Sequence, residues 1–546
     1  MIDAGVQPCT GDRLARGSTV LNSTRFTNAL DHAWVRRLTW LVFPLTIIFA
    51  ITRQSLWTDE GFTVWFASHR SLSTFFSALI GSPGAPGDPQ LIFYLLYMWG
   101  WIKAFGTSEL ALRAANIPFA ILFIGTMAWA SRNLLRRPGL WVYFCLSPFF
   151  WFYLNEARPY VALLAFSSVA SVALLAYLLN PLEYKVLGPW ACLVALLWAL
   201  GTHIMAAFLL PTLLVLVALT VMGDPARGRS FLKDWSRPSL LCLPAFVALG
   251  AFYLWASTYG ASKGYGKPTL SSLAFVLYEF AGFSGLGPPR NDLRNGPQLL
   301  VFVPFWPFIL LGFIALLGVV FFLFSPHPPK IVISLAASLS VGVAIALIIS
   351  MIVDVRILGR HMAALFPLLL ITPMFWLKHS YNSRLASYGA IAAPVVLAVA
   401  WGISDARLVL LHKYQKDSYR EAAFTAIARV HSDQGKILWA ADPHTAHYYG
   451  IQVRKGGQSA EIGNDDGMEW PAAVQAADAV NWTPEEARAY LDTATTPTIL
   501  VLGKTDSFDR NAAWRAQIQL PESAGIAQLS AFSIYEWQPK RVVPRR

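Results

Sequence analysis

The stretch Ser55-Leu56-Trp57-Thr58-Asp59-Glu60-Gly61-Phe62 places two adjacent carboxylates directly after the first long apolar run of the chain, at 38–52. A charge inside the hydrocarbon of a bilayer is costly, so acids at this point are expected at the membrane interface or facing a watery cavity. Asp59 and Glu60 are therefore either site residues or two solvated acids of a loop. The rest of the sequence favours a site.

The composition is that of a polytopic membrane protein. Of the 546 residues, 55% are hydrophobic and only 14% are charged, whereas a soluble domain carries about 25% charged residues. The formal net charge of +12 does not indicate nucleic-acid binding, because the basic residues lie in short loops between apolar runs, which is typical of orientation signals in membrane proteins. The four cysteines show neither a disulfide framework nor the spacing of metal ligands. We expect no metal site and no cofactor, and a requirement for a divalent metal stays open.

Apolar runs of nearly membrane-spanning length recur along the chain. A helix needs about 20 residues to cross the roughly 30 Å of bilayer hydrocarbon. The runs predict eleven transmembrane helices, which lie at about 38–52, 113–131, 139–154, 160–180, 187–202, 204–222, 239–256, 298–324, 331–352, 361–377 and 385–403. Residues 1–37 are predicted to be a cytoplasmic tail without a cleaved signal peptide.

The apolar segment 90–105 needs a separate argument, because its 16 residues would span only about 24 Å as a helix. Arg36 and Arg37 are expected to keep the preceding tail in the cytoplasm. If 90–105 does not cross the membrane, the basic loops at 132–137 and 227–237 also lie in the cytoplasm, as the positive-inside rule requires. We therefore predict that 90–105 lies at the membrane interface.

The first periplasmic loop is then long, at 53–112. It holds the interfacial segment above and a second amphipathic stretch at 62–80, of the kind that lies in the headgroup plane. The Gly- and Pro-rich residues 81–89 cannot form a regular helix. This topology places Glu156, at the end of the third span, on the same face as Asp59.

Residues 404–546 differ from the transmembrane domain predicted at 38–403, because apolar content drops and charges become mixed. Helical and strand patterns alternate there, which predicts a small periplasmic α/β domain. The predicted helices lie at 419–430 and 484–491, and the predicted strands at 437–440, 498–502 and 533–537.

The external side carries residue types that suit phosphate chemistry. Carboxylates act as general bases on hydroxyl groups, and arginines offer a planar fork to phosphate. Apolar helices would hold a lipid tail. The residues on this side are Asp59, Glu60, Glu156, Arg158, Arg356, Arg360 and His361. The combination suits transfer from a lipid-linked phosphate to a hydroxyl, without naming the sugar or the acceptor.

Six short motifs follow one another between about residues 40 and 400. They are Trp57-Thr58-Asp59-Glu60; Asp88-Pro89-Gln90-Leu91-Ile92-Phe93-Tyr94; Phe105-Gly106 with Ser108-Glu109-Leu110-Ala111-Leu112-Arg113; Ser147-Pro148 and Tyr153 with Glu156-Ala157-Arg158-Pro159-Tyr160; Thr202-His203; and Arg360-His361 with Pro367. In this order the chain resembles the membrane-embedded, polyprenyl-phosphate-dependent glycosyltransferases of the C-type fold. It resembles more closely the bacterial relatives of protein O-mannosyltransferases and of the lipid A aminoarabinose transferase.

The resemblance implies an inverting glycosyltransferase of the inner membrane with its active site on the periplasmic side. The donor would be an undecaprenyl-phosphate-linked sugar, and the acceptor a lipid, a glycan or a protein hydroxyl. Asp59 would be the general base, Glu60 would shape the site, and Glu156 would orient the acceptor or the sugar. The donor phosphate would be bound by residues among Arg158, Arg360, Arg356, His361 and Tyr160. Possible substrate contacts are Asp88 and His203.

One departure concerns Asp88, because the family usually has His or Lys at that place. A catalytically silent scaffold relative therefore remains an alternative. A flippase or transporter of lipid-linked sugars is a second one, but transporters place charged groups within their spans at the membrane midplane. The predicted spans here contain almost no charge, which favours the enzyme.

Bland interpretations of single residues also stay open. In one such interpretation, Glu156 and Arg158 only form a local salt bridge with each other. Arginines 356 and 360 are interface anchors in another, and His203 is a satisfied core histidine. The basic residues of the loop at 257–297, including Arg290, are interpreted as solvated charges.

Overall fold

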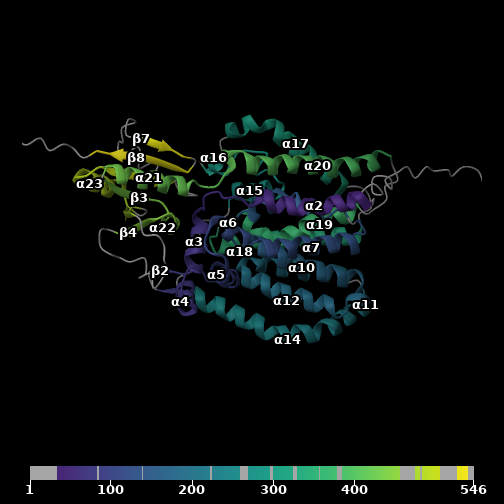
Figure 1. The fold of residues 1–546 in the computed structure, drawn as a ribbon. Helices are drawn as coiled ribbons and strands as arrows, with labels where there is room; N and C mark the ends of the chain where they lie inside the picture. Colours follow the sequence, from purple (N-terminus) through teal and green to yellow (C-terminus); the bar gives the residue numbers. More distant parts are fainter. Residues whose placement is uncertain are drawn as a thin grey trace, which may run out of the picture.

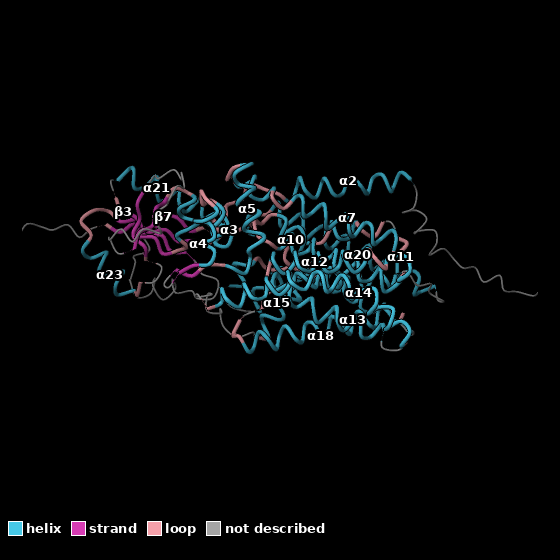
Figure 2. The backbone as a smooth tube through the Cα atoms, turned by 90° about the horizontal axis from the view of Figure 1, so that it is seen from below, coloured by secondary structure: helices cyan, strands magenta, loops and turns pink. Residues whose placement is uncertain are grey.

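The computed structural model describes residues 33–82, 85–137, 139–221, 224–258, 269–294, 299–323, 329–355, 357–377, 384–433, 435–455, 474–479, 482–503, 525–529 and 531–538. Long helices lie side by side in an elongated bundle, and the large β-sheet is gathered beyond one end of it (Figure 1, Figure 2). Helices α3 and α4 lie at that same end.

Seven helical segments of the described chain are long and apolar enough to cross a membrane: Glu109–Asn133, Tyr160–Leu179, Ile204–Val221, Pro225–Ser257, Leu300–Gly318, Lys330–Ile352 and Ala392–Leu410. Each of them overlaps a predicted span. Many of their large apolar side chains are exposed on the outside of the bundle. Such a surface suits lipid rather than water, so the chain is a multi-pass membrane protein.

The helices that contain these segments are α6 (Glu109–Ala114), α7 (Ile117–Asn133), α10 (Tyr160–Leu179), η2 (Ile204–Phe208), α13 (Leu209–Val221), α14 (Pro225–Ser257), η3 (Leu299–Phe305), α17 (Trp306–Leu323), α18 (Lys330–Ile352) and α20 (Arg384–Leu410). Helix α10 is apolar around nearly its whole circumference, and most of its residues are buried. A helix with no polar face belongs inside a bundle, and α10 packs between α7 and α12.

The other four predicted spans are helical but shorter or broken. They correspond to α2 (Ala33–Ala50), to α8 (Val142–Cys145) with α9 (Pro148–Leu154), to α12 (Leu187–Thr202), and to η4 (Gly359–Leu365) with α19 (Phe366–Leu377). The break between α8 and α9 comes just before Pro148, which begins α9, since proline has no N–H to offer a preceding turn. Eleven crossings therefore stay a prediction.

The predicted first periplasmic loop folds into short elements at the sheet-bearing end of the bundle. These are α3 (Thr58–Ala67), α4 (Leu72–Ile80), β1 (Gly81–Ser82), β2 (Ala85–Pro86), η1 (Pro89–Leu91) and α5 (Ile92–Phe105). The amphipathic stretch predicted at 62–80 is two helices rather than one, because Ser71 caps a new helix by accepting from the Thr74 N–H at 3.1 Å. The 14 residues of α5 span only about 21 Å.

The last predicted span does not end at residue 403. Helix α20 continues to Leu410, and a linker with η5 (His412–Tyr414) leads from it to α21 (Tyr419–Asp433). The remaining small helices are α11 (Pro181–Tyr184), α15 (Leu270–Phe280), α16 (Arg290–Arg294), α22 (Pro443–Tyr448) and α23 (Pro484–Thr493).

The large sheet has six strands in the order β4-β5-β3-β6-β8-β7. Its strands are β3 (Lys436–Ala440), β4 (Ile451–Lys455), β5 (Val474–Asp478), β6 (Thr498–Gly503), β7 (Gly525–Gln528) and β8 (Phe532–Trp537). Strands β4, β5, β3 and β6 pair in parallel, whereas β8 pairs antiparallel with both β6 and β7. Every residue of β6 is buried, as expected for a strand covered on both faces.

One face of the sheet shares a hydrophobic core with the first loop. Trp439 and Val501 belong to the same cluster of buried side chains as Leu56 and Val64. Helices α3 and α22 can approach closely because residue 61 is glycine: a Cβ atom there would lie 2.0 Å from the Thr445 hydroxyl oxygen. The sheet is therefore packed onto the loop that carries Asp59 and Glu60.

Candidate active site

Asp59 lies in the first turn of α3, and its side chain is 25% exposed. Arg360, from η4, donates from Nη1 to Asp59 Oδ2 at 3.0 Å. The guanidinium also lies 5.3 Å from the centre of the Trp57 ring. Residues 301 positions apart thus form a partly exposed carboxylate–arginine pair at the end of the bundle.

Arg158 holds the backbone of the same turn. Its Nη1 donates to the Asp59 carbonyl and to the Thr63 hydroxyl, each at 3.2 Å. The local salt bridge with Glu156 is absent from the ion pairs of the described residues, so that interpretation is wrong. Asp88 is close enough to both Arg158 and Asp59 for their charges to affect its pKa. Burial raises the pKa of Asp88, the positive charge of Arg158 opposes this rise, and the negative charge of Asp59 adds to it.

Three aromatic or imidazole rings extend this group. The ring centres of Tyr160 and His203 are 6.0 Å apart, and those of His203 and His361 are 6.5 Å apart. His203 is buried, and its Nδ1 accepts from the Met205 N–H at 3.2 Å. We call Asp59, Asp88, Arg158, Tyr160, His203, Arg360 and His361 the Asp59 cluster. Arg356 lies outside the described residues.

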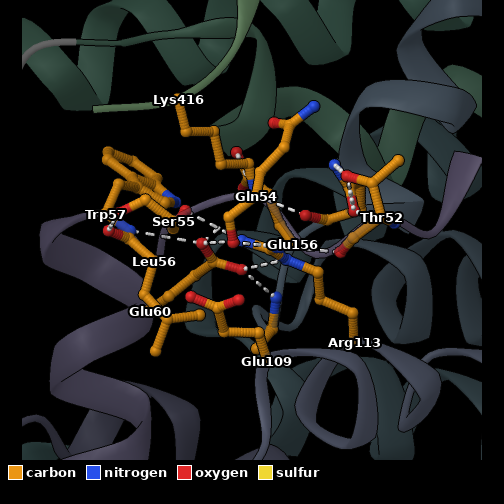
Figure 3. A network of polar contacts seen from close by, with 12 residues as sticks. Thr52, Gln54, Ser55, Leu56, Trp57, Glu60, Glu109, Arg113, Glu156 and Lys416 are labelled. Carbon is orange, nitrogen blue, oxygen red and sulfur yellow. Dashed lines mark hydrogen bonds and ion pairs between the residues drawn. The ribbon is translucent and has the colours of Figure 1, made fainter. Parts of the chain in front are cut away.

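Glu60 follows Asp59 in sequence but is completely buried, and Figure 3 shows the polar contacts around it. Its Oε1 accepts from Arg113 Nε at 3.1 Å and from the Ala157 N–H at 2.9 Å, and its Oε2 accepts from Arg113 Nη2 at 3.0 Å. Lys416 Nζ lies 3.3 Å from Oε2. Burial alone would raise the pKa of Glu60, but Arg113 and Lys416 outweigh it and lower the pKa to about 2.

Arg113 also binds the backbone that leads to the site. Its Nη1 donates to the carbonyls of Thr52 and Gln54 at 2.9 and 2.7 Å, and its Nη2 donates to the Ser55 carbonyl at 3.0 Å. A buried guanidinium with carboxylate and carbonyl acceptors has few free donors left. Arg113 therefore fixes the path of the chain between α2 and α3.

Glu156 is the second buried acid, in the turn between α9 and α10. Among the described residues, neither of its carboxylate oxygens has a hydrogen-bond partner. The nearest cation is Lys416, whose Nζ lies 3.9 Å from Oε1. Burial raises the pKa of Glu156 to about 7 and lowers that of Lys416 to about 8. We call Glu60, Arg113, Glu156 and Lys416 the Glu60 cluster.

The sequence suggested that Arg290 is a solvated loop charge, but the structure shows that it is paired. It forms an ion pair with buried Glu279, and its Nη2 donates to the Tyr153 hydroxyl at 3.0 Å. Its guanidinium also stacks 3.9 Å from the centre of the Phe152 ring. This pair lies next to the site, since a Cβ atom at position 359, beside Arg360, would collide with the Glu279 side chain if Gly359 were replaced.

The structure thus brings the predicted site residues that it describes into two neighbouring clusters. Arg113 and Lys416 were not predicted as site residues. Arg113 stood in a quoted motif at the start of a span, and Lys416 in a charged linker that looks solvated. Among the described residues, no group of three or more His, Cys, Asp or Glu side chains is arranged to hold a metal ion.

The fold and the site define a multi-pass membrane protein with an acid–arginine site at one end of its helical bundle. No family model and no curated protein matches the chain. Among solved structures, it is similar to the crystal structure of ArnT from Cupriavidus metallidurans bound to undecaprenyl phosphate. The two chains are 14% identical with a TM-score of 0.48, and the match covers 92% of this chain and 98% of the other. A likeness at this score assigns neither a fold nor a function to this chain.

Proposed function

We propose that this chain is a membrane glycosyltransferase of the C-type fold, which transfers a sugar from a polyprenyl-phosphate donor to a hydroxyl acceptor. The observation that carries the proposal is the Asp59–Arg360 pair, a partly exposed carboxylate 3.0 Å from a guanidinium at the end of an apolar bundle. The order of motifs in the sequence supports the same class.

The chemistry divides between the two partners. Asp59 would accept the proton of the acceptor hydroxyl while that oxygen forms a bond to the anomeric carbon. The bond from this carbon to the phosphate oxygen breaks, and the electron pair leaves with the polyprenyl phosphate. Arg360 would compensate the charge of the leaving group, since a guanidinium has five N–H donors to share between a carboxylate and a phosphate. Displacement in line inverts the anomeric centre.

The surroundings of the pair suit such substrates. Apolar side chains exposed on the bundle offer a surface for a polyprenyl tail. Arg158 steadies the backbone of Asp59, and Glu156 is the second acid, suited to orienting the sugar or the acceptor. We further propose an undecaprenyl-phosphate-linked donor and a location in the inner membrane, with α3 and the sheet on the periplasmic side.

The test is release of free polyprenyl phosphate by the purified chain from a panel of polyprenyl-phosphate sugars. The matched variants are Asp59→Asn and, as a control at an exposed acid of the small helix α11, Glu183→Gln. Release by the wild type and the control but not by Asp59→Asn supports the proposal. No release from any donor, with donor binding intact in wild type and variant, would instead indicate a transporter or a silent scaffold.

A further inference from the structure

Lys416 brings a positive charge from the linker into the buried part of the site. It lies between η5 and α21, on the way from the bundle to the large sheet. Its side chain is only 6% exposed, with Nζ 3.3 Å from Glu60 Oε2 and 3.9 Å from Glu156 Oε1. It also donates to the carbonyl of Asn155. A lysine buried between two acids is far from the solvated charge that its sequence context suggests.

The two acids depend on this lysine to different degrees. Glu60 has four further hydrogen bonds, from Arg113, from the Ala157 N–H and from the Trp57 N–H at 3.3 Å. The Glu156 carboxylate has none among the described residues, so only nearby charges oppose the effect of burial and favour its ionised form. Loss of Lys416 should therefore alter Glu156 far more than Glu60.

The other charged and titratable groups around Glu156 come from several elements. Arg290 and Arg360 favour its ionised form, and Glu60 opposes it. The nearby hydroxyl groups are those of Tyr94, Tyr153 and Tyr160. Arg290 and Arg360 are already paired with Glu279 and Asp59. Lys416 is the cation within 4 Å of Glu156 in the described structure.

We infer that Lys416 is a positioning residue of the proposed transferase, whose ammonium group favours the ionised form of Glu156 and so links the docking of the C-terminal sheet to the reaction. The inference rests on the proposed function. Lys416 also lines a cavity together with Gln54, Asn155 and Trp151.

The sign of the effect follows from the charges. Burial raises the pKa of Glu156 to about 7, and Lys416 pulls it down. Removing the ammonium leaves burial opposed only by more distant cations, so the pKa rises further, by about one unit or more for an opposite charge at this distance. An arginine at position 416 keeps the charge and should keep the pKa.

The first measurement needs no substrate. Infrared titration of the purified protein follows the protonated carboxyl band of Glu156, which is assigned by its loss in Glu156→Gln. The expected midpoint is near pH 7 in the wild type, higher in Lys416→Met, and unchanged in Lys416→Arg. Lys413→Met is the matched control, because Lys413 lies in the same linker but stacks on the Phe305 ring. If Lys416→Met does not fold, Lys416→Gln replaces it.

The second measurement is the pH profile of polyprenyl phosphate release by the same variants. The acid limb should move to higher pH in Lys416→Met, with about a fivefold loss of rate at pH 7 for the first unit of movement above a pKa near 7, and should stay in place in Lys416→Arg. An infrared midpoint that does not move in Lys416→Met overturns the inference, whatever the activity. If the midpoint moves between the wild type and Lys416→Met but the wild type releases nothing from any donor, the Lys416–Glu156 link is supported and only the proposed function is overturned.

Discussion

Asp59 and Glu60 are neighbours in sequence, yet they occupy opposite environments. Asp59 is partly exposed and forms an ion pair with Arg360 of η4, which lies 301 positions later in the chain. Glu60 is completely buried and meets Arg113 through two hydrogen bonds. A helix turns by 100° per residue, so adjacent side chains of α3 cannot face the same surroundings.

The difference separates the work of the two acids. A general base must be able to reach its substrate, and the partly exposed Asp59 meets this condition. The pKa of Glu60 is held at about 2, so this acid stays ionised at any physiological pH and serves as a fixed anchor. Of the two adjacent acids, one is suited to chemistry and the other to holding the loop in place.

The largest effect is expected from Asp59→Asn. The substitution keeps the size of the side chain but removes the base, so the rate of transfer should fall by about 100- to 10,000-fold. The thermal unfolding profile should stay close to that of the wild type. Steady-state release of polyprenyl phosphate measures the first quantity. Full activity in this variant would show that Asp59 is not the general base, and the proposed division of roles between Asp59 and Glu60 would then be wrong.

Glu60→Gln should instead act on stability. Breaking a buried ion pair by removing one partner leaves the Arg113 charge uncompensated, at a cost of about 3–5 kcal/mol. Unfolding in detergent, followed by tryptophan fluorescence, measures the change. Glu421→Gln serves as the control, since Glu421 pairs with Arg420 at a more exposed position. A stable Glu60→Gln variant that has lost transfer would show that Glu60 acts in the reaction.

Arg360→Lys should have a smaller effect on activity. Lysine keeps the charge but loses the planar fork, and a charge-assisted hydrogen bond contributes about 1.5–3 kcal/mol. The kcat/KM for the donor should fall by roughly 10- to 100-fold. Arg132→Lys, at an exposed position in the last turn of α7, is the control. An unchanged kcat/KM in Arg360→Lys would indicate that Arg360 only balances the charge of Asp59.

The smallest effect is expected from Tyr449→Phe, at the contact between the sheet domain and the first loop. The hydroxyl accepts from the Leu56 N–H and donates to Glu109 Oε1, each at 2.6 Å. Losing both bonds should cost about 1–3 kcal/mol of stability. The same unfolding assay measures it, with Tyr535→Phe on β8 as the control. If Tyr449→Phe loses no more stability than Tyr535→Phe, the two hydrogen bonds of the Tyr449 hydroxyl do not help to hold the sheet domain on the first loop.

Much of the bundle is predictable from sequence because one physical requirement, the thickness of the bilayer, leaves its mark in every apolar run. Helix α10 is an example, since its span was predicted at 160–180 and lies at Tyr160–Leu179. Breaks such as the one between α4 and α3 are harder, because a single serine cap decides them.

The site is predictable where motifs mark it and not where only the fold brings residues together. Asp59 and Arg360 stand in motifs, although nothing local shows that they pair across 301 positions. Lys416 carries no such mark, because a lysine among charged linker residues looks the same whether it is solvated or buried. Its partners can be identified only from the fold, in which the linker after α20 places Lys416 beside Glu60 and Glu156.

The shared core of the first loop and the sheet also orders events in time. Leu56 and Val64, near the start of the chain, pack in the same cluster as Phe532 and Ile534 of β8, near its end. A growing chain cannot bury the first pair until the last strand has been synthesised, delivered to the same side of the membrane and folded. The core around the loop that carries Asp59 therefore cannot be complete until β8 has been synthesised and has folded against it.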